Sequence, residues 1–196
     1  MRIGLITDTH LPNILRDLGE LGPEIAQFFS TVDLILHAGD IVGPHVLDWL
    51  EQFAPVIAAQ GNNDSLDDPR VAPVQVLDIA GWRSGMVHSL VPEGRPLRLL
   101  AETRFRTPVD ILVCGHTHYE RLEYREGLVL INSGSPVFPH HKSVRLGTVG
   151  LLDIQPGALH AEIVLLGETP GRPNPGKPVA LDLGEGQRSF TPESAR

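Results

Sequence analysis

The sequence predicts an α/β fold with two mixed β-sheets packed face to face and flanked by helices, a four-layer α-β-β-α sandwich within a single domain. Two observations predict it. Short apolar runs alternate with helical stretches in the first half of the chain, and strand pairs around glycine-containing turns dominate the second half. At 196 residues the chain is long enough for one domain with a substantial core.

The first 115 residues hold four short apolar runs that have the length and composition of strands. They lie at 3–6, 32–36, 55–59 and 110–114. Apolar residues recur at helical spacing behind Pro23, Pro44 and Pro96, and proline suits the first turn of a helix. This βαβαβ order predicts a largely parallel sheet.

The later segments of the chain read as hairpins. The segments 74–89, 121–132 and 146–166 each contain two strand-like runs around a turn with glycine, and they predict a second sheet that is at least partly antiparallel. Residues 167–196 are dense in proline, glycine and charge, with little apolar surface to bury. We therefore expect a domain at 1–166 and a disordered or loosely attached tail at 167–196.

Charge and cysteine content exclude several classes of protein. The formal net charge of −8 argues against a protein that binds the nucleic-acid backbone. Cys114 is the only cysteine, so the chain has neither an internal disulfide nor a cysteine-based zinc site. No segment approaches the ~20 apolar residues of a membrane span. We expect a soluble, cytoplasmic protein without a membrane partner, and the sequence leaves a homo-oligomer open.

The predicted strands end in side chains that bind metals. These are Asp8, His10, Asp40, Asn62, His88, His116 and His118. In an open α/β sheet the carboxyl ends of strands converge on one crevice, so these residues should lie together. Mixed oxygen and nitrogen ligands are typical of Mn, Fe, Zn or Ni. Seven ligands suit two cations roughly 3.5 to 4 Å apart, the geometry used for in-line displacement at phosphorus.

The order of these motifs resembles that of a known family. The set Asp-x-His, Gly-Asp, Gly-Asn-x-Asp, His and Gly-His-x-His is similar to the calcineurin-like metallophosphoesterase superfamily. The run INSGSP at 131–136 and the small size resemble its compact phosphodiesterase branch, which includes the retromer scaffold subunit. The resemblance covers residues 1 to about 166. It implies one metal site at Asp8, His10, Asp40 and His118, and a second at Asp40, Asn62, His88 and His116, with Asp40 bridging.

The resemblance also implies an activity. Two divalent ions, manganese first and Zn, Fe, Ni or Mg as alternatives, would activate a bridging hydroxide that attacks the phosphorus of a small phosphodiester. A phosphomonoesterase or nuclease with the same site, and a non-catalytic scaffold that binds partner proteins, stay open as alternatives. The intact ligand set argues against the scaffold. The negative charge and Asn63 argue against the monoesterase and the nuclease.

Residues beside the predicted ligands have further expected roles. Many relatives carry a proton-donating histidine where this chain has Asn63, and an amide cannot supply a proton near neutral pH. Asp64 matches the family's supporting acid, and Asn63 and His37 are also expected to support the ligands from behind. Asn63, His141 and Arg145 are the expected contacts to substrate.

Overall fold

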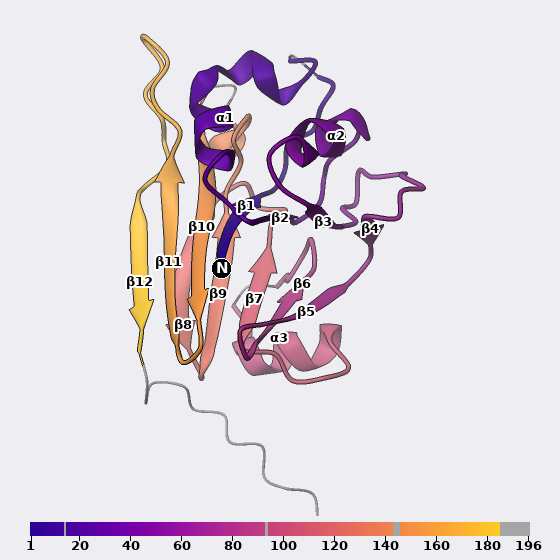
Figure 1. Ribbon diagram of the computed structural model, residues 1–196, viewed down its shortest axis with the longest axis vertical. Coiled ribbons are helices and arrows are strands. Elements are labelled where there is room, and N and C mark those ends of the chain that lie inside the picture. The colour runs from indigo at the N-terminus through magenta and orange to yellow at the C-terminus, as the bar shows by residue number, and fades with distance from the viewer. Residues whose placement is uncertain (14, 93, 143–145, 185–196) are drawn as a thin grey trace, which may run out of the picture.

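A computed structural model describes residues 1–13, 15–92, 94–142 and 146–184. Among these residues, a pair of β-sheets pack face to face, and helices cover both outer faces (Figure 1). The α/β class and the four-layer sandwich expected from the sequence are therefore confirmed.

The larger sheet has the strand order β12-β11-β10-β1-β2-β3-β4 in the described residues. Its strands are β1 (Arg2–Ile6), β2 (Leu34–His37), β3 (Val56–Ala59), β4 (Val71–Ala72), β10 (Thr148–Gln155), β11 (Ala158–Leu165) and β12 (Val179–Leu183). The strands β1 to β4 pair in parallel, as the βαβ pattern predicts. The other strands pair antiparallel, and β10 runs antiparallel beside β1.

The smaller sheet has the order β5-β6-β7-β9-β8. It consists of β5 (Gln75–Ile79), β6 (Trp82–Met86), β7 (Ile111–Cys114), β8 (Glu120–Arg125) and β9 (Leu128–Ser133). Its three central strands, β6, β7 and β9, are parallel, and the two edge strands pair antiparallel. The loops that follow the parallel strands of the two sheets meet, because the backbone N–H of His116, after β7, donates to the carboxylate of Asp8, after β1.

In the part of the chain that the structure describes, three α-helices form at or just after the prolines. They are α1 (Pro23–Phe29), α2 (His45–Glu51) and α3 (Leu97–Arg104), and two short 3-10 turns, η1 (Leu18–Leu21) and η2 (Pro139–His141), also occur. The apolar side chains of α1 and α2, such as Phe29 and Leu47, pack on the larger sheet. Those of α3, such as Leu100, pack on the smaller one. A third core, which includes Leu36 and Val113, fills the space between the sheets.

Two expectations about strand partners differ from the structure. The pattern predicts the run at 110–114 in the first parallel sheet, but β7 lies between β6 and β9 in the smaller sheet. The pattern also predicts that the hairpin at 146–166 belongs to the second sheet. In the structure β10 pairs with β1, so this hairpin extends the larger sheet. Local apolar patterns identify strands, whereas their partners depend on contacts between segments far apart in the sequence.

The tail also differs from its expectation where it is described. Residues Val179–Leu183 form β12, which pairs antiparallel with β11 at the edge of the larger sheet. Leu183 is only 4% exposed and belongs to the core between the sheets, so this short run does bury one apolar side chain. Residues 185–196 lie outside the described residues. None of the helices in the described ranges is long and apolar enough to cross a membrane.

Candidate metal centre

The candidate ligands lie in loops that follow five parallel strands. Asp8 and His10 follow β1, and one candidate each follows β2, β3 and β6. His116 and His118 follow β7. The structure brings all seven predicted residues together, through the contacts described next.

The first group consists of Asp8, His10 and His118. The Nε2 atoms of His10 and His118 are 3.0 Å apart. Oδ1 of Asp8 lies 3.6 Å from Nε2 of His118 and 3.9 Å from Nε2 of His10. These atoms are close enough to surround one cation.

The second group gathers around His88. Its Nε2 lies 3.1 Å from Oδ1 of Asn62, 3.3 Å from Oδ2 of Asp40 and 3.3 Å from Nδ1 of His116. The two groups are adjacent, because Oδ2 of Asp40 is also 3.6 Å from Nε2 of His10. Asp8 reaches both groups as well, since its Oδ1 is 4.0 Å from Nε2 of His88. Both carboxylates therefore lie between the groups.

Hydrogen bonds at the far side of two rings show that this donor set fits divalent cations. Nδ1 of His88 lies 2.8 Å from the carbonyl oxygen of Ala38, and Nδ1 of His118 lies 3.0 Å from that of Phe138. A carbonyl oxygen only accepts, so each ring donates from Nδ1, and in the neutral ring Nε2 carries a lone pair. Those lone pairs face the oxygens of Asp8, Asp40 and Asn62, which are acceptors too. Such convergence of acceptors is what a cation stabilises.

Burial sets the electrostatics of the centre. It raises the pKa of Asp8 to about 7 and lowers the pKa of His118 to about 4. For Asp40, burial raises the pKa, but hydrogen bonds from Nε2 of a protonated His88 and from Asn63 outweigh it and hold that pKa below its ordinary value. Burial likewise lowers the pKa of His88, but the hydrogen bond that the protonated ring donates to Asp40 and the nearby Asp8 raise it above its ordinary value in the metal-free protein. The buried carboxylates thus favour a positive charge beside them.

The backbone of the ligand loops is strained. Positive φ angles occur at Asp8 (54°), His10 (48°), Asp40 (55°), His116 (76°) and His118 (59°). Such angles are uncommon outside glycine and cost on the order of 1–3 kcal/mol each where the conformation is unfavourable. Their concentration in the loops that carry the candidate ligands is typical of a functional site.

Two glycines let these loops approach each other. A Cβ atom at Gly61 would collide with the backbone nitrogen and carboxylate of Asp40. A Cβ atom at Gly115 would collide with the hydroxyl of Thr7 and lie 2.7 Å from Oδ2 of Asp8. The sequence predicts a ligand-bearing loop after each of these glycines, and the structure adds that close packing requires them.

Asp64 ties two ligand loops together. Its Oδ1 accepts hydrogen bonds from the backbone N–H groups of Ile41 (2.7 Å) and Val42 (2.8 Å), and its Oδ2 accepts one from Gly61 (2.8 Å). The loops that carry Asp40 and Asn62 are therefore held by one carboxylate.

His37 has a comparable position behind the loop after β1. Its Nδ1 accepts a 3.2 Å hydrogen bond from the backbone N–H of Gly39, so its Nε2 donates to the hydroxyl of Thr9, 3.1 Å away. Burial lowers the pKa of His37 to about 3, which keeps the ring neutral. Through these two hydrogen bonds the ring connects the loops after β1 and β2.

The expected substrate contacts have mixed outcomes. The side-chain amide of Asn63 donates to Oδ2 of Asp40 at 2.7 Å, so in this structure it supports a candidate ligand. The ring of His141 stacks on that of His118 with centroids 4.4 Å apart, which places it beside the centre. Arg145 lies outside the described residues.

Two supporting residues are not singled out by the sequence patterns. The hydroxyl of Ser135 donates a 2.8 Å hydrogen bond to the backbone carbonyl of Asp8. The amide of Asn132 donates to the carbonyl of Gly115 at 2.9 Å and to the hydroxyl of Thr117 at 3.1 Å. Both residues belong to the INSGSP run, which is the sequence motif that could have identified them. Their hydrogen bonds hold the loops after β1 and β7 in place.

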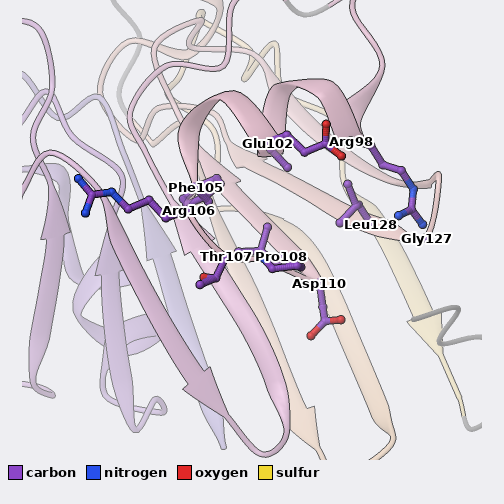
Figure 2. A pocket seen from close by; sticks show the side chains of 11 residues that line it. Arg98, Glu102, Phe105, Arg106, Thr107, Pro108, Asp110, Gly127 and Leu128 are labelled. Carbon is purple, nitrogen blue, oxygen red and sulfur yellow. The ribbon is translucent and has the colours of Figure 1, made fainter. Parts of the chain in front are cut away.

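A separate cavity of about 400 Å³ lies at the other end of β7. It is lined by side chains of α3 and of the segment before β7, among them Arg98, Phe105 and Asp110 (Figure 2). None of the seven candidate ligands borders it. This cavity is therefore distinct from the metal centre.

Known proteins share both sequence and fold with this chain. A probable metallophosphoesterase from Methanothermobacter thermautotrophicus is 35% identical over 170 residues, which cover 85% of this chain and 94% of that protein. A phosphodiesterase from Methanocaldococcus jannaschii is 27% identical over 176 residues, covering 84% of this chain and 99% of that protein. The crystal structure of Entamoeba histolytica Vps29 complexed with Zn²⁺ superposes with a TM-score of 0.71 at 22% identity, covering 94% of this chain and 99% of that one.

The likeness to Vps29 shows the fold, and the sequence matches show the family. Residues 1–157 match the calcineurin-like phosphoesterase superfamily domain. The motifs that indicated this family in the sequence lie inside the matched range, and Vps29, the retromer scaffold subunit of the expected branch, shares the fold. The chain therefore belongs to the calcineurin-like phosphoesterase superfamily.

Proposed function

We propose that this metallophosphoesterase is a phosphodiesterase that hydrolyses small phosphodiesters with two divalent metal ions. The observation that carries the proposal is the convergence of seven oxygen and nitrogen ligands in two adjacent groups. His10 and His118 would serve the first ion, and Asn62, His88 and His116 the second. We assign Asp8 to the first site and Asp40 as the bridge, because Oδ2 of Asp40 lies 3.3 Å from Nε2 of His88 and 3.6 Å from that of His10, whereas Oδ1 of Asp8 lies 4.0 Å from Nε2 of His88.

The bound ions would supply an activated water and positive charge for the phosphate oxygens. The protein's own contribution is to hold the ligands in place before substrate arrives. Phe138 and Ala38 orient the rings of His118 and His88 through their carbonyl oxygens, so that Nε2 of each ring faces the centre. Asp64 keeps the loops of Asp40 and Asn62 at a fixed separation. This preorganisation lowers the cost of assembling the site.

The environment of Asn63 restricts the leaving group. Its amide is bound to Asp40, and an amide cannot protonate a departing alkoxide near neutral pH. Esters with good leaving groups need little protonation. The archaeal phosphodiesterase at 27% identity supports the choice of a diester over a monoester. Manganese is the proposed metal, with Zn, Fe, Ni and Mg as alternatives, and zinc is found in the Vps29 structure of similar fold. A cytoplasmic location is proposed with it, which fractionation of cells would test.

The proposal can be tested with metal-stripped protein. Bis(4-nitrophenyl) phosphate and 4-nitrophenyl phosphate would be assayed after Mn, Zn, Ni, Mg or Fe is added back singly. We expect metal-dependent hydrolysis, with a higher kcat/KM for the diester. A higher kcat/KM for the monoester would favour a phosphomonoesterase. Metal binding without hydrolysis of any ester would favour a scaffold that retains the site.

A further inference from the structure

A cavity of about 400 Å³ opens directly beside the second ligand group. Asn62 and His88 contribute to its lining, and Arg104, the last residue of α3, lines it as well. The volume lies within the range of small-molecule sites. A substrate held at the metal centre therefore has room for one of its ester groups next to Asn62 and His88.

The lining of this cavity suits a ring or short chain that carries polar atoms. Pro73, Val74 and Val87 supply apolar surface. Ser89 supplies a hydroxyl that is buried and has no hydrogen-bond partner among the described residues. A buried hydroxyl without a partner is costly, so a ligand that bonds to it gains from this contact.

Arg104 adds a positive charge to the same cavity. It is exposed, and no ion pair or hydrogen bond of its side chain is found within the described ranges of the chain. By contrast, Arg70 forms an ion pair with the carboxylate of Asp68 at 2.6 Å. The guanidinium of Arg104 is thus available to bind an oxyanion, for which its planar donors are well suited.

We propose that this cavity binds one ester group of the phosphodiester, and that Arg104 selects ester groups bearing a second negative charge, such as a carboxylate or a further phosphate. The inference rests on the proposed phosphodiesterase activity and adds the substrate class. The chain's overall negative charge makes a neutral or cationic ester group the default preference. Arg104 reverses this preference locally.

The test compares bis(4-nitrophenyl) phosphate with its analogue that carries one carboxylate on each ring. Because both ester groups are altered alike, the orientation of the substrate does not matter. The measured quantity is the ratio of kcat/KM for the charged diester to that for the neutral one. Comparing this ratio between variants cancels the intrinsic reactivity of each substrate.

The Arg104→Gln variant is expected to lower this ratio by about tenfold relative to the wild type, because kcat/KM should fall for the charged diester alone. Arg104→Glu should lower it further. The matched control is Arg98→Gln, which changes another arginine of α3 that borders the separate cavity in Figure 2. Its ratio should equal that of the wild type.

An unchanged ratio in Arg104→Gln, or an equal loss with both diesters, would overturn the inference while leaving the phosphodiesterase proposal standing. If neither diester is hydrolysed with any metal, the phosphodiesterase proposal fails instead. In that case, calorimetric titration of the same two diesters measures their Kd values without turnover and tests whether the cavity binds the charged ester group. A ratio of Kd values that changes about tenfold in Arg104→Gln, and not in Arg98→Gln, supports it, and equal ratios reject it.

Discussion

Asn63 binds both carboxylate oxygens of Asp40, with its backbone N–H donating to Oδ1 at 2.9 Å and its side-chain amide donating to Oδ2 at 2.7 Å. The residue at this position thus orients the proposed bridging ligand, and its amide cannot protonate the departing oxygen of a substrate. Losing a positioned general acid typically costs about 10²- to 10⁴-fold in rate. We therefore predict fast hydrolysis of nitrophenyl diesters and much slower hydrolysis of alkyl diesters.

The measurement is kcat across diesters of graded leaving-group pKa, in the wild type and in Asn63→His. A steep dependence is expected in the wild type, and a shallower one in Asn63→His where the new ring faces the leaving group. A flat dependence in the wild type, with chemistry shown to be rate-limiting, would mean that another acid acts. His141, stacked beside His118, would be the first residue to examine.

Asp64→Ala tests whether one carboxylate holds the two ligand loops. Three backbone N–H groups, of Ile41, Val42 and Gly61, lose their acceptor, and we expect a loss of about 2–4 kcal/mol in the free energy of unfolding. Metal affinity should fall as well, because the loops of Asp40 and Asn62 separate. Urea unfolding and metal titration would measure both effects. Asp67→Ala, an exposed carboxylate in the same loop, is the control, and equal losses in the two variants would contradict the assignment.

Asp8 should make the metal-free protein less stable as pH rises. Burial raises the pKa of Asp8 from 3.8 to about 7, so the folded state binds this proton more tightly than the unfolded state does. The contribution of Asp8 is complete below about pH 4 and is lost as pH rises to about 7. The raised pKa of His88 acts in the same direction above its ordinary value of 6.5, whereas the lowered pKa values of His37 and His118 act in the opposite direction below 6.5. Comparison with a variant that lacks the Asp8 carboxyl therefore isolates the contribution of Asp8.

Denaturant midpoints in the presence of chelator, from pH 5 to pH 8, would measure this dependence. Asp8→Asn removes the proton-binding group, so the metal-free variant should be more stable than the metal-free wild type at pH 8. A difference in midpoint between Asp8→Asn and the wild type that stays constant from pH 5 to pH 8 would show that Asp8 takes up no proton in this range, against its burial.

The tail contains a structural strand, and truncations can separate this strand from the residues after it. Ending the chain after Gly184 removes only residues outside the described ranges and should leave stability and activity unchanged. Ending it after Leu166 removes β12 and the buried Leu183, and should cost about 2–5 kcal/mol in the free energy of unfolding. Thermal and urea unfolding would compare the two, and equal stability would show that β12 adds nothing.

The sequence predicts the layers of the fold and the positions of the candidate ligands because both follow from local patterns of apolar and polar residues. Apolar runs at 3–6 and 110–114 end in polar side chains, and the ends of parallel strands meet at one edge. The pairing of β10 with β1, and the place of β7, could not be predicted this way because they depend on contacts across more than 100 residues or between sheets. The same is true of the hydrogen bond from Ser135 to Asp8.

The sequence does not predict β12 for a different reason. Its five residues lie in a segment rich in proline and glycine, where composition favours disorder, and a single buried leucine with one strand partner is enough to hold it. The orientation of Asn63 toward Asp40 likewise could not be read from the motif, since it depends on the turn after Gly61. Composition and motif spacing identify which residues matter, and tertiary contacts decide what each one binds.

The most direct test of the binuclear site is the number of metal ions bound per chain, measured by calorimetric titration and elemental analysis in the wild type, His118→Ala, His88→Ala and Asp40→Ala. Two ions are expected in the wild type and one in each histidine variant, because His118 and His88 belong to different ligand groups. Asp40→Ala should lose hydrolysis and weaken both ions. A wild type that saturates with a single ion, or an Asp40→Ala variant that keeps two tightly bound ions and full turnover, would contradict the proposed centre.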